Sequence, residues 1–175
     1  YCQNWQISQA DPLETPHYEL PPELVVERAL GAQCRSIAYT YTDPIIFYEY
    51  VLDTAKIARE RGLVVIEDAA HAIEAVYRGR KVGSIGDLTV FSFYVTKNIT
   101  TGEGGMVTTN NPAWAEQIEM YGLHGLNKGA WRRYTDDGFK HYEVVYPGYK
   151  YNMTDLQASL GIHQLPRIER YLRRR

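Results

Sequence analysis

The stretch that decides the fold runs from Leu63 to Asp68 and reads Leu-Val-Val-Ile-Glu-Asp. Its first four residues form a short continuous apolar run, which is typical of a strand covered on both faces. A second run of this kind, Leu-Thr-Val-Phe-Ser-Phe-Tyr, occupies residues 88–94, and a third buried strand is expected over 105–109. Strands of this type belong to parallel sheets, so the sequence predicts an α/β fold with a mainly parallel sheet.

Helices are expected around these strands. Apolar residues recur at helical spacing, or helix-start signals occur, in 23–30, 45–61, 112–121, 154–164 and 166–175. A strand rich in Tyr, Thr and Ile is expected over 36–42, a turn-rich ribbon over 77–86, and a further helix, which Asp68 could cap, over 69–76. Thr154 or Asp155 is expected to cap the helix over 154–164.

Composition excludes several classes of protein. The chain has 175 residues, 45% of them hydrophobic, and a net charge of −2, which is ordinary globular material and gives no case for nucleic-acid binding. No apolar run approaches the roughly 20 residues of a membrane span. Two cysteines cannot form a disulfide framework, so a cytoplasmic protein is expected. The chain begins at Tyr1 and ends in the basic run 170–175, so we expect a piece that is incomplete at both ends.

Two polar residues follow the expected buried strands: Asp68 after the first and Lys97 after the second. Ligands of open α/β sheets bind outside the carboxyl ends of the strands, so an acid and an amine there could face one pocket. A lysine that sheds its proton can form an imine with an aldehyde, and an aspartate can keep a pyridine nitrogen protonated. Pyridoxal phosphate (PLP) needs both groups together with phosphate donors, for which Ser92 and the turn 100–105 are candidates.

Each of these residues also has a plainer interpretation. Asp68 alone is typical of a helix cap, and His71 alone of a half-buried, hydrogen-bonded histidine. Lys97 alone is typical of a solvated lysine, and Ser92 of a small core residue. Spacing therefore leaves the cofactor and the structural interpretations open.

Five motifs that occur in one order favour the cofactor interpretation. They read Val-Ile-Glu-Asp-Ala-Ala-His-Ala (65–72), Gly-Arg-Lys-Val-Gly-Ser-Ile-Gly-Asp (79–87), Phe-Ser-Phe-Tyr-Val-Thr-Lys-Asn (91–98), Thr-Gly-Glu-Gly-Gly (101–105) and Pro-Gly-Tyr-Lys-Tyr-Asn-Met-Thr-Asp (147–155). With these motifs the chain, from about residue 62 to its end, resembles the DegT/DnrJ/EryC1/StrS sugar aminotransferases. The resemblance implies part of the large domain of the aspartate-aminotransferase fold (fold type I).

The resemblance also implies roles for individual residues. Lys97 matches the lysine that carries PLP as an imine and moves the proton during amino transfer. Asp68 matches the partner of the pyridinium nitrogen, His71 the residue that lies against the cofactor ring, and Ser92 a phosphate ligand. Relatives that replace the lysine with histidine perform dehydration, so Lys97 favours amino transfer.

The resemblance further implies substrates and partners. The amino donor would be glutamate, the acceptor a nucleotide-linked keto-sugar, and the enzyme a homodimer with a shared active site. Residues 148–152 match a loop that reaches the partner subunit's cofactor. Many relatives have Gly-x-Asn-x-Arg there, whereas this chain has Gly-Tyr-Lys-Tyr-Asn, so Lys150 would supply the charge, with Asn152 at the end of the motif.

The first sixty residues resemble a different family. Tyr-Cys-Gln-Asn-Trp-Gln-Ile-Ser-Gln (1–9), Leu-Pro-Pro-Glu-Leu-Val-Val (20–26) and Cys-Arg-Ser-Ile-Ala-Tyr-Thr-Tyr-Thr-Asp-Pro (34–44) are similar to radical SAM enzymes of the AmmeMemoRadiSam and pyruvate formate-lyase-activating type. Cys2 would be the last cysteine of their CxxxCxxC motif. A 4Fe–4S cluster that binds S-adenosylmethionine needs three thiolates, and only Cys2 of the motif is present, so no metal site is predicted.

These resemblances predict a join of two partial domains. Residues 1–61 form the radical-SAM-like part and residues 62–175 the aminotransferase part, with a crossover between about residues 54 and 64. Two alternatives to the aminotransferase interpretation stay open: a fragment of a radical SAM iron–sulfur enzyme, and an inactive truncated α/β module.

Overall fold

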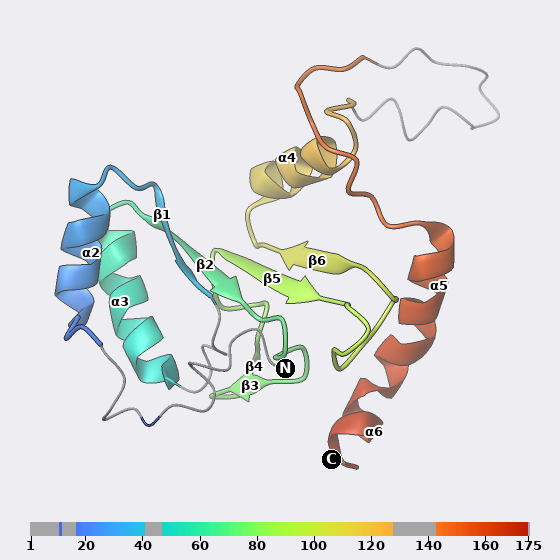
Figure 1. Ribbon diagram of the computed structural model, residues 1–175, viewed down its shortest axis with the longest axis horizontal. Helices are drawn as coiled ribbons and strands as arrows, with labels where there is room; N and C mark the ends of the chain where they lie inside the picture. Colours follow the sequence, from blue (N-terminus) through green and yellow to red (C-terminus); the bar gives the residue numbers. More distant parts are fainter. Residues whose placement is uncertain (1–10, 12–16, 41–46, 128–142, 175) are drawn as a thin grey trace.

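A four-stranded sheet organises the chain. The computed structural model describes residues 11, 17–40, 47–127 and 143–174. The strands are β1 (Ser36–Tyr39), β2 (Val64–Asp68), β5 (Leu88–Ser92) and β6 (Gly105–Thr108), in the spatial order β1-β2-β5-β6 (Figure 1). β1, β2 and β5 are parallel, and β6 is antiparallel to β5. The predicted α/β fold with a mainly parallel sheet is confirmed.

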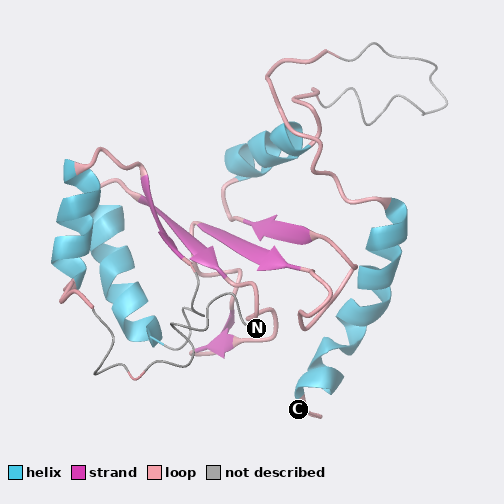
Figure 2. Cartoon of the chain, in the orientation of Figure 1, coloured by secondary structure: helices cyan, strands magenta, loops and turns pink. Residues whose placement is uncertain are grey.

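The helices fall within or close to the predicted segments. They are α2 (Pro22–Gly31), α3 (Tyr48–Glu60), α4 (Pro112–Gly122), α5 (Asp155–Gln164), the 3₁₀ turn η3 (Leu165–Arg167) and α6 (Ile168–Leu172) (Figure 2). Thr154 caps α5 in a capping box, because its hydroxyl accepts from the Gln157 N–H while the Gln157 side chain accepts from the Thr154 N–H. No helix in the described ranges is long and apolar enough to cross a membrane.

The strand register separates the two faces of the sheet. Residues paired across strands share a face and alternate along each strand, so Ala38, Ile66, Val90 and Val107 lie on one face. Asp68 and Ser92 follow the same alternation and lie on this face as well. The opposite face carries Ile37, Val65 and Phe91, which belong to apolar clusters, and also Met106.

Two apolar clusters cover that second face. Val26 of α2 and Ala58 of α3 are fully buried against Leu63 and Val65 beside β1 and β2. The second cluster lies beside β5 and takes in residues from the turns and from the C-terminal helices: Ala69, Ala72, Val82, Phe91, Phe93 and Ile99, with Met153 and Ile168 packed against them. Burial of these side chains stabilises the layer by roughly 25 cal/mol per Å² of apolar surface removed from water.

The helix predicted over 69–76 is wrong. The chain instead makes successive turns, in which the Ala72 N–H donates to the Ala69 carbonyl at 3.0 Å and the Ala75 N–H to the Ala72 carbonyl at 3.0 Å. Asp68 accepts from the Ala70 N–H at 3.0 Å and so closes a turn, not a helix. Ala69 and Ala72 are buried in the second cluster, and this packing overrides their helix propensity.

The ribbon predicted over 77–86 is confirmed as a hairpin of β3 (Val76–Tyr77) and β4 (Arg80–Lys81). The third strand is confirmed as β6, but the expectation that it is buried is wrong: Met106 is 53% exposed and Val107 39% exposed. β6 runs antiparallel because residues 93–104 hold turns and lack the crossover helix that a parallel return requires.

Candidate active site

Asp68 and Ser92 end two neighbouring parallel strands and line one pocket. Asp68 pairs with Val90 in the β2–β5 register, so Ser92 lies two residues further along the sheet edge. The pocket has a volume of about 300 Å³, and its other lining residues are Ala38, Thr40, Ile66, Ala70, Val90 and Phe91. Both polar side chains are half-buried. The pocket lies at the carboxyl ends of the strands, as expected, but Lys97, the amine expected to face the same pocket, is not one of its lining residues.

Each of these two side chains is held by the backbone that follows it. One oxygen of Asp68, Oδ1, accepts from the Ala70 N–H at 3.0 Å, which fixes the carboxylate at the strand end. Ser92 Oγ accepts from the Tyr94 N–H at 3.3 Å, so its own O–H can still donate to a ligand. Together they offer an acceptor for a cation and a donor for an anion.

Lys97 and His71 are in direct contact. Lys97 Nζ lies 2.6 Å from His71 Nε2, although 26 residues separate them in the sequence. Lys97 is placed by a turn in which its N–H donates to the Tyr94 carbonyl at 2.9 Å, and it is half-buried. His71 lies in the turns after β2 and is exposed. An amine and an imidazole at this distance share one hydrogen, which is the arrangement needed to pass a proton between them.

Two residues that support this contact were missed from the sequence. Asn98 Nδ2 donates to the His71 carbonyl at 3.3 Å and also to Glu74 Oε2. Glu74 is buried, with 5% of its surface exposed. A long-range partner for a buried carboxylate leaves no periodic signal in the sequence, and only the burial of a charged residue within an apolar segment could have suggested it.

The glycine-rich turn over 100–105 is held by hydrogen bonds at several points. Thr101 Oγ1 donates to the Glu103 carbonyl at 2.7 Å, and the Phe93 N–H donates to the Gly104 carbonyl at 2.8 Å. The side chain of Gln164 bonds both backbone groups of Thr100. The turn predicted from its glycines is therefore tied to β5 on one side and to α5 on the other.

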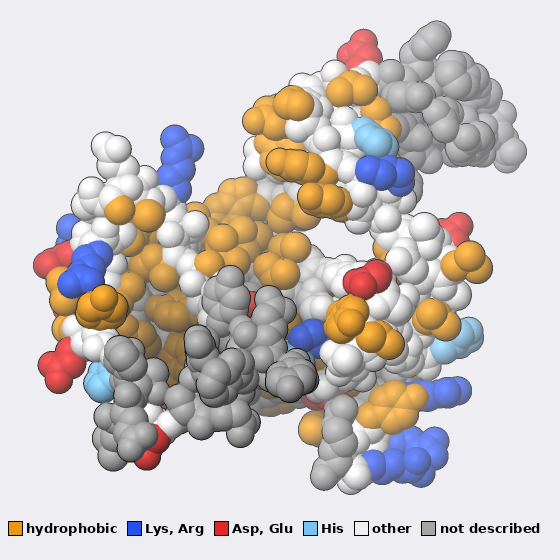
Figure 3. All heavy atoms as spheres, viewed as in Figure 1, with side chains coloured by type: hydrophobic (Ala, Val, Ile, Leu, Met, Phe, Trp, Pro, Cys, Tyr) orange, Lys and Arg blue, Asp and Glu red, His pale blue; other side chains and the backbone are white. Residues whose placement is uncertain are grey.

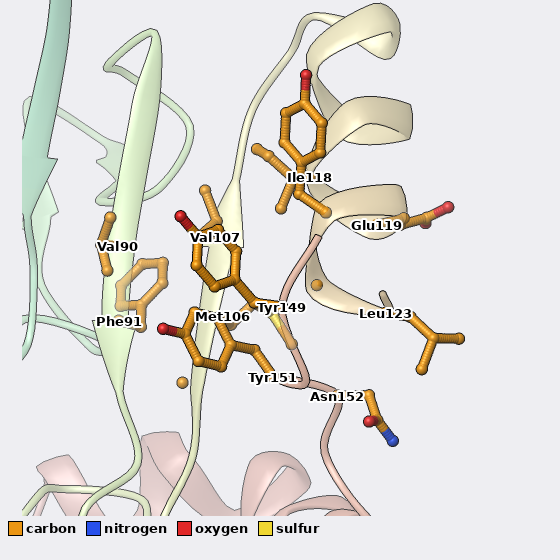
Figure 4. Close-up of a pocket in the computed structure, with 13 residues that line it drawn as sticks. Val90, Phe91, Met106, Val107, Ile118, Glu119, Leu123, Tyr149, Tyr151 and Asn152 are labelled. Atoms are coloured by element: carbon orange, nitrogen blue, oxygen red, sulfur yellow. The ribbon is translucent and has the colours of Figure 1, made fainter. Parts of the chain in front are cut away.

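Asn152 lines a second cavity, of about 900 Å³, between β5, β6 and α4, as do Tyr149 and Tyr151 on either side of Lys150 in the sequence. Lys150 is exposed and its Nζ donates to Asn152 Oδ1. Tyr149 and Tyr151 stack at 5.0 Å and point toward the strands, while Asn152 points away from them (Figure 4). Hydrophobic side chains lie on both sides of the hollow between α4 and the sheet (Figure 3). Neither Lys150 nor Asn152 lines the pocket of Asp68 and Ser92, although the two cavities share Val90 and Phe91.

A buried carboxylate lies directly before Asp68. Glu67 is 6% exposed, and its Oε2 accepts from Thr89 Oγ1 at 3.1 Å. Burial raises the pKa of the Glu67 carboxyl, and the hydrogen bond from Thr89 opposes part of this rise. Burial also raises the pKa of Tyr48 to about 12, to which the Glu67 charge contributes. These groups belong to the packed side of β2 and β5.

Metal-binding groups are not assembled in the part of the chain that the structure describes. Within those ranges no group of three or more His, Cys, Asp or Glu side chains could hold a metal ion. Cys34 is exposed and free. Cys2 and the segment 42–44 of the radical-SAM resemblance lie outside the described residues.

The chain matches a known enzyme family over most of its length. Residues 51–175 match the DegT/DnrJ/EryC1/StrS aminotransferase family. The chain belongs to this family. The matched range includes the strand end with Asp68, the loop with Lys97 and the segment with Lys150.

Relatives and solved structures agree with this assignment. The spore coat polysaccharide biosynthesis protein SpsC of Bacillus subtilis is 55% identical over 119 residues, which are 68% of this chain and 31% of SpsC. The putative sugar aminotransferase Spr1654 from Streptococcus pneumoniae, solved in its PMP-form, has a TM-score of 0.67 at 31% identity and covers 85% of this chain and 40% of Spr1654. DesI, solved in the presence of its TDP-sugar product, has a TM-score of 0.54 at 30% identity and covers 69% of this chain and 28% of DesI.

The extent of these matches limits what they describe. The chain spans about a third of the length of the curated relatives it matches. The likeness to Spr1654 covers a larger share of the chain than residues 51–175, so it includes part of the segment before residue 51. The predicted resemblance of residues 1–61 to radical SAM enzymes stays a prediction.

Proposed function

We propose that this chain carries the PLP-binding region of an aminotransferase that moves an amino group from glutamate to a nucleotide-linked keto-sugar. The observation that carries the proposal is the 2.6 Å contact between Lys97 and His71, on turns that follow the strand ends bearing Asp68 and Ser92. Family membership supports amino transfer. The polysaccharide role in the name of SpsC and the TDP-sugar product of DesI support a nucleotide sugar as acceptor.

The side chains in place fit PLP. Asp68 has Oδ1 on a backbone N–H, and Oδ2 is the acceptor for a protonated ring nitrogen. The Ser92 hydroxyl is a donor suited to a phosphate, and Lys97 is an amine for the aldehyde. All three come from the carboxyl ends of β2 and β5 or the loop after them. This donor set matches the three kinds of contact that the cofactor requires.

When bound, PLP supplies an electron sink for the carbon that loses and regains a proton. Lys97 would hold the cofactor through its Nζ at rest and would afterwards carry that proton on the same nitrogen. His71 Nε2 takes up or returns a proton at Nζ across the 2.6 Å contact. Asp68 stabilises the protonated ring nitrogen, because an adjacent carboxylate favours the cationic form. Ser92 orients the phosphate.

Addition of PLP to the cofactor-free protein tests the proposal. A visible absorption band should appear, and borohydride should trap the cofactor on the Lys97 peptide, as identified by mass spectrometry. Lys97→Ala should abolish both signals, whereas Lys56→Ala should retain them, since Lys56 is exposed and pairs with Asp53 on α3. Trapping on other lysines, with none on Lys97, would refute the proposal. In a sample without borohydride, addition of glutamate should remove the visible absorption band.

We further infer a homodimer in which Lys150 reaches the partner subunit's cofactor. Lys150 and its neighbours Tyr149 and Tyr151 are exposed, the two tyrosines by 59% and 77%, so this segment is available for such a contact. Lys150→Ala should weaken PLP binding. Mixing Lys97→Ala chains with Lys150→Ala chains should restore trapping in mixed dimers, and failure of restoration would place Lys150 outside a shared site.

We also infer that the chain joins two partial domains, of which residues 1–61 are radical-SAM-like and residues 62–175 aminotransferase-like. The sequence resemblances alone support it, because the family match starts at residue 51, before the inferred boundary, and the likeness to Spr1654 extends further toward the N-terminus. β1 pairs in parallel with β2 from Ser36 to Tyr39, so both parts contribute to one sheet. Single-molecule sequencing across codons 50–65 of the source locus tests whether the join is natural. The count of two cysteines supports a cytoplasmic location.

A further inference from the structure

Asn98 ties the two turns of the candidate site together. It follows Lys97 directly, and its Nδ2 donates one hydrogen to the His71 carbonyl at 3.3 Å and the other to Glu74 Oε2. A primary amide has two donors on one nitrogen, so both bonds form from a single rotamer. Asn98 therefore binds the turn of His71 at two points, the His71 carbonyl and the Glu74 side chain.

Glu74 is buried and is hydrogen-bonded to a neighbouring strand. It is 5% exposed, and its backbone carbonyl accepts from Lys81 Nζ at 3.5 Å. Lys81 in turn forms an ion pair with Glu169 of α6. The turn that carries His71 is thus anchored to β4 and α6, and Asn98 couples the Lys97 loop to the same anchor.

We propose that Asn98 is a positioning residue that, through Glu74, sets the separation of His71 Nε2 and Lys97 Nζ. The lysine side chain has four rotatable bonds and His71 is exposed, so neither is confined by packing alone. Fixing both backbones limits how far apart the two nitrogens can move. The use of this contact in catalysis rests on the proposed function, whereas the experiment below observes the contact itself in the cofactor-free protein.

Substitution of Asn98 does not change any charged group near the contact. The ionisable groups around the contact are Asp68 three residues before His71, Glu74 in the same turn, and the Lys81–Glu169 pair. Asn98→Ala leaves all of them unchanged and removes only the two hydrogen bonds. Its effect on the contact therefore reports positioning.

The experiment uses the cofactor-free protein in solution. The nuclear Overhauser effect between the Lys97 CεH₂ protons and the His71 ring reports the contact, and the rate of Lys97 trapping by PLP reports its use. Asn98→Ala should lose the Overhauser effect and slow trapping by about tenfold to a hundredfold, the cost of a misplaced reacting group. Asn110→Ala, on the exposed turn before α4, is the matched control and should behave as wild type.

Rescue at the other end of the hydrogen bond sharpens the test. Glu74→Gln keeps an acceptor oxygen for Asn98 and should retain the Overhauser effect, whereas Glu74→Ala should lose it. If Asn98→Ala fails to fold, Asn98→Ser, whose hydroxyl is too short to reach Glu74, takes its place with the same expected loss.

Two results overturn the proposal. One is a folded Asn98 variant that keeps the wild-type Overhauser effect and trapping rate. The other is a Glu74→Gln protein that behaves as Glu74→Ala does. A wild-type protein that never reacts with PLP, but loses the Overhauser effect in Asn98→Ala, would refute the proposed function while supporting the positioning role.

Discussion

The side-chain amide of Gln164 pairs with both backbone groups of Thr100, 64 residues earlier in the chain. Gln164 Nε2 donates to the Thr100 carbonyl at 2.6 Å, and Gln164 Oε1 accepts from the Thr100 N–H at 3.1 Å. The amide thus makes the same pair of bonds that the backbone of a neighbouring strand would make. It joins the end of α5 to the loop that contains Lys97. The position of α5 and the shape of the loop are therefore linked.

Removal of this pairing should destabilise the protein. Gln164→Ala loses the two half-buried hydrogen bonds to Thr100, each worth about 0.5–1.5 kcal/mol, and an exposed one to the Leu160 carbonyl, so we expect the free energy of unfolding to fall by about 1–3 kcal/mol. Urea unfolding measures the change. Ser159→Ala on the exposed side of the same helix is the control and should stay within about 0.5 kcal/mol of wild type. An equal loss in both variants would contradict the assignment to Thr100.

Glu67→Gln should alter the dependence of stability on pH. Burial raises the pKa of Glu67 above its ordinary value of 4.5, so the folded state binds its proton more tightly than the unfolded state. The stability contributed by Glu67 is then complete below pH 4.5 and is lost as the pH rises through the folded pKa. The amide has no proton to lose and still accepts from Thr89, so the decline should flatten.

Denaturant unfolding at several pH values between 4 and 8 tests this expectation. Glu143→Gln, at an exposed carboxyl, is the matched control and should leave the wild-type decline intact. A Glu67→Gln protein whose stability declines with pH as steeply as wild type would show that this carboxyl does not set the slope.

Asp87 should contribute more to stability than an ordinary surface carboxylate. Its two oxygens accept from Arg59 of α3, Nη2 at 2.7 Å and Nε at 3.2 Å, and Oδ2 also accepts from the Val65 N–H at 2.9 Å. Asp87→Asn disrupts this bidentate pair and should cost about 1–3 kcal/mol of unfolding free energy. Asp53→Asn, which breaks an exposed pair with Lys56, should cost less than about 1 kcal/mol in the same urea titration.

Gly125→Ala should be strongly destabilising. Gly125 has φ +70°, and a Cβ added to it would collide with the backbone carbonyl of Tyr146. A non-glycine residue in strained backbone costs about 1–3 kcal/mol before any clash is counted. Gly122→Ala, at the end of α4 with open space around its Cβ, is the matched control. Thermal unfolding should show a loss at position 125 and none at 122.

The sheet and its helices were predictable because local patterns determine them. The apolar runs of β2 and β5 are visible in sequence, and α3 and α4 show helical spacing between clear end signals. The segment 69–76 failed because Ala69 and Ala72, good helix formers, are buried by residues distant in sequence. The antiparallel direction of β6 depends on what lies between the strands, which a strand pattern does not encode.

The candidate site was only partly predictable for the same reason. The strand-end rule places Asp68 and Ser92 at one edge, and this required no family knowledge. His71 and Lys97 meet only after both turns have folded, and their expected roles came from the family resemblance. Asn98 and Gln164 act over 24 and 64 residues through ordinary amides, so their composition and spacing carry no distinguishing mark.

Ser92 and Gly105 are cross-strand partners in the β5–β6 pair, so the chain leaves the sheet and re-enters it at a single position. The intervening segment 93–104, which carries Lys97, can therefore differ in length without a change in the register of the two strands. Its Phe93 and Ile99 are buried in the second apolar cluster, so an exchanged segment has to keep apolar residues at these two positions. With those two positions kept, Lys97 can acquire new surroundings while the supporting sheet stays the same.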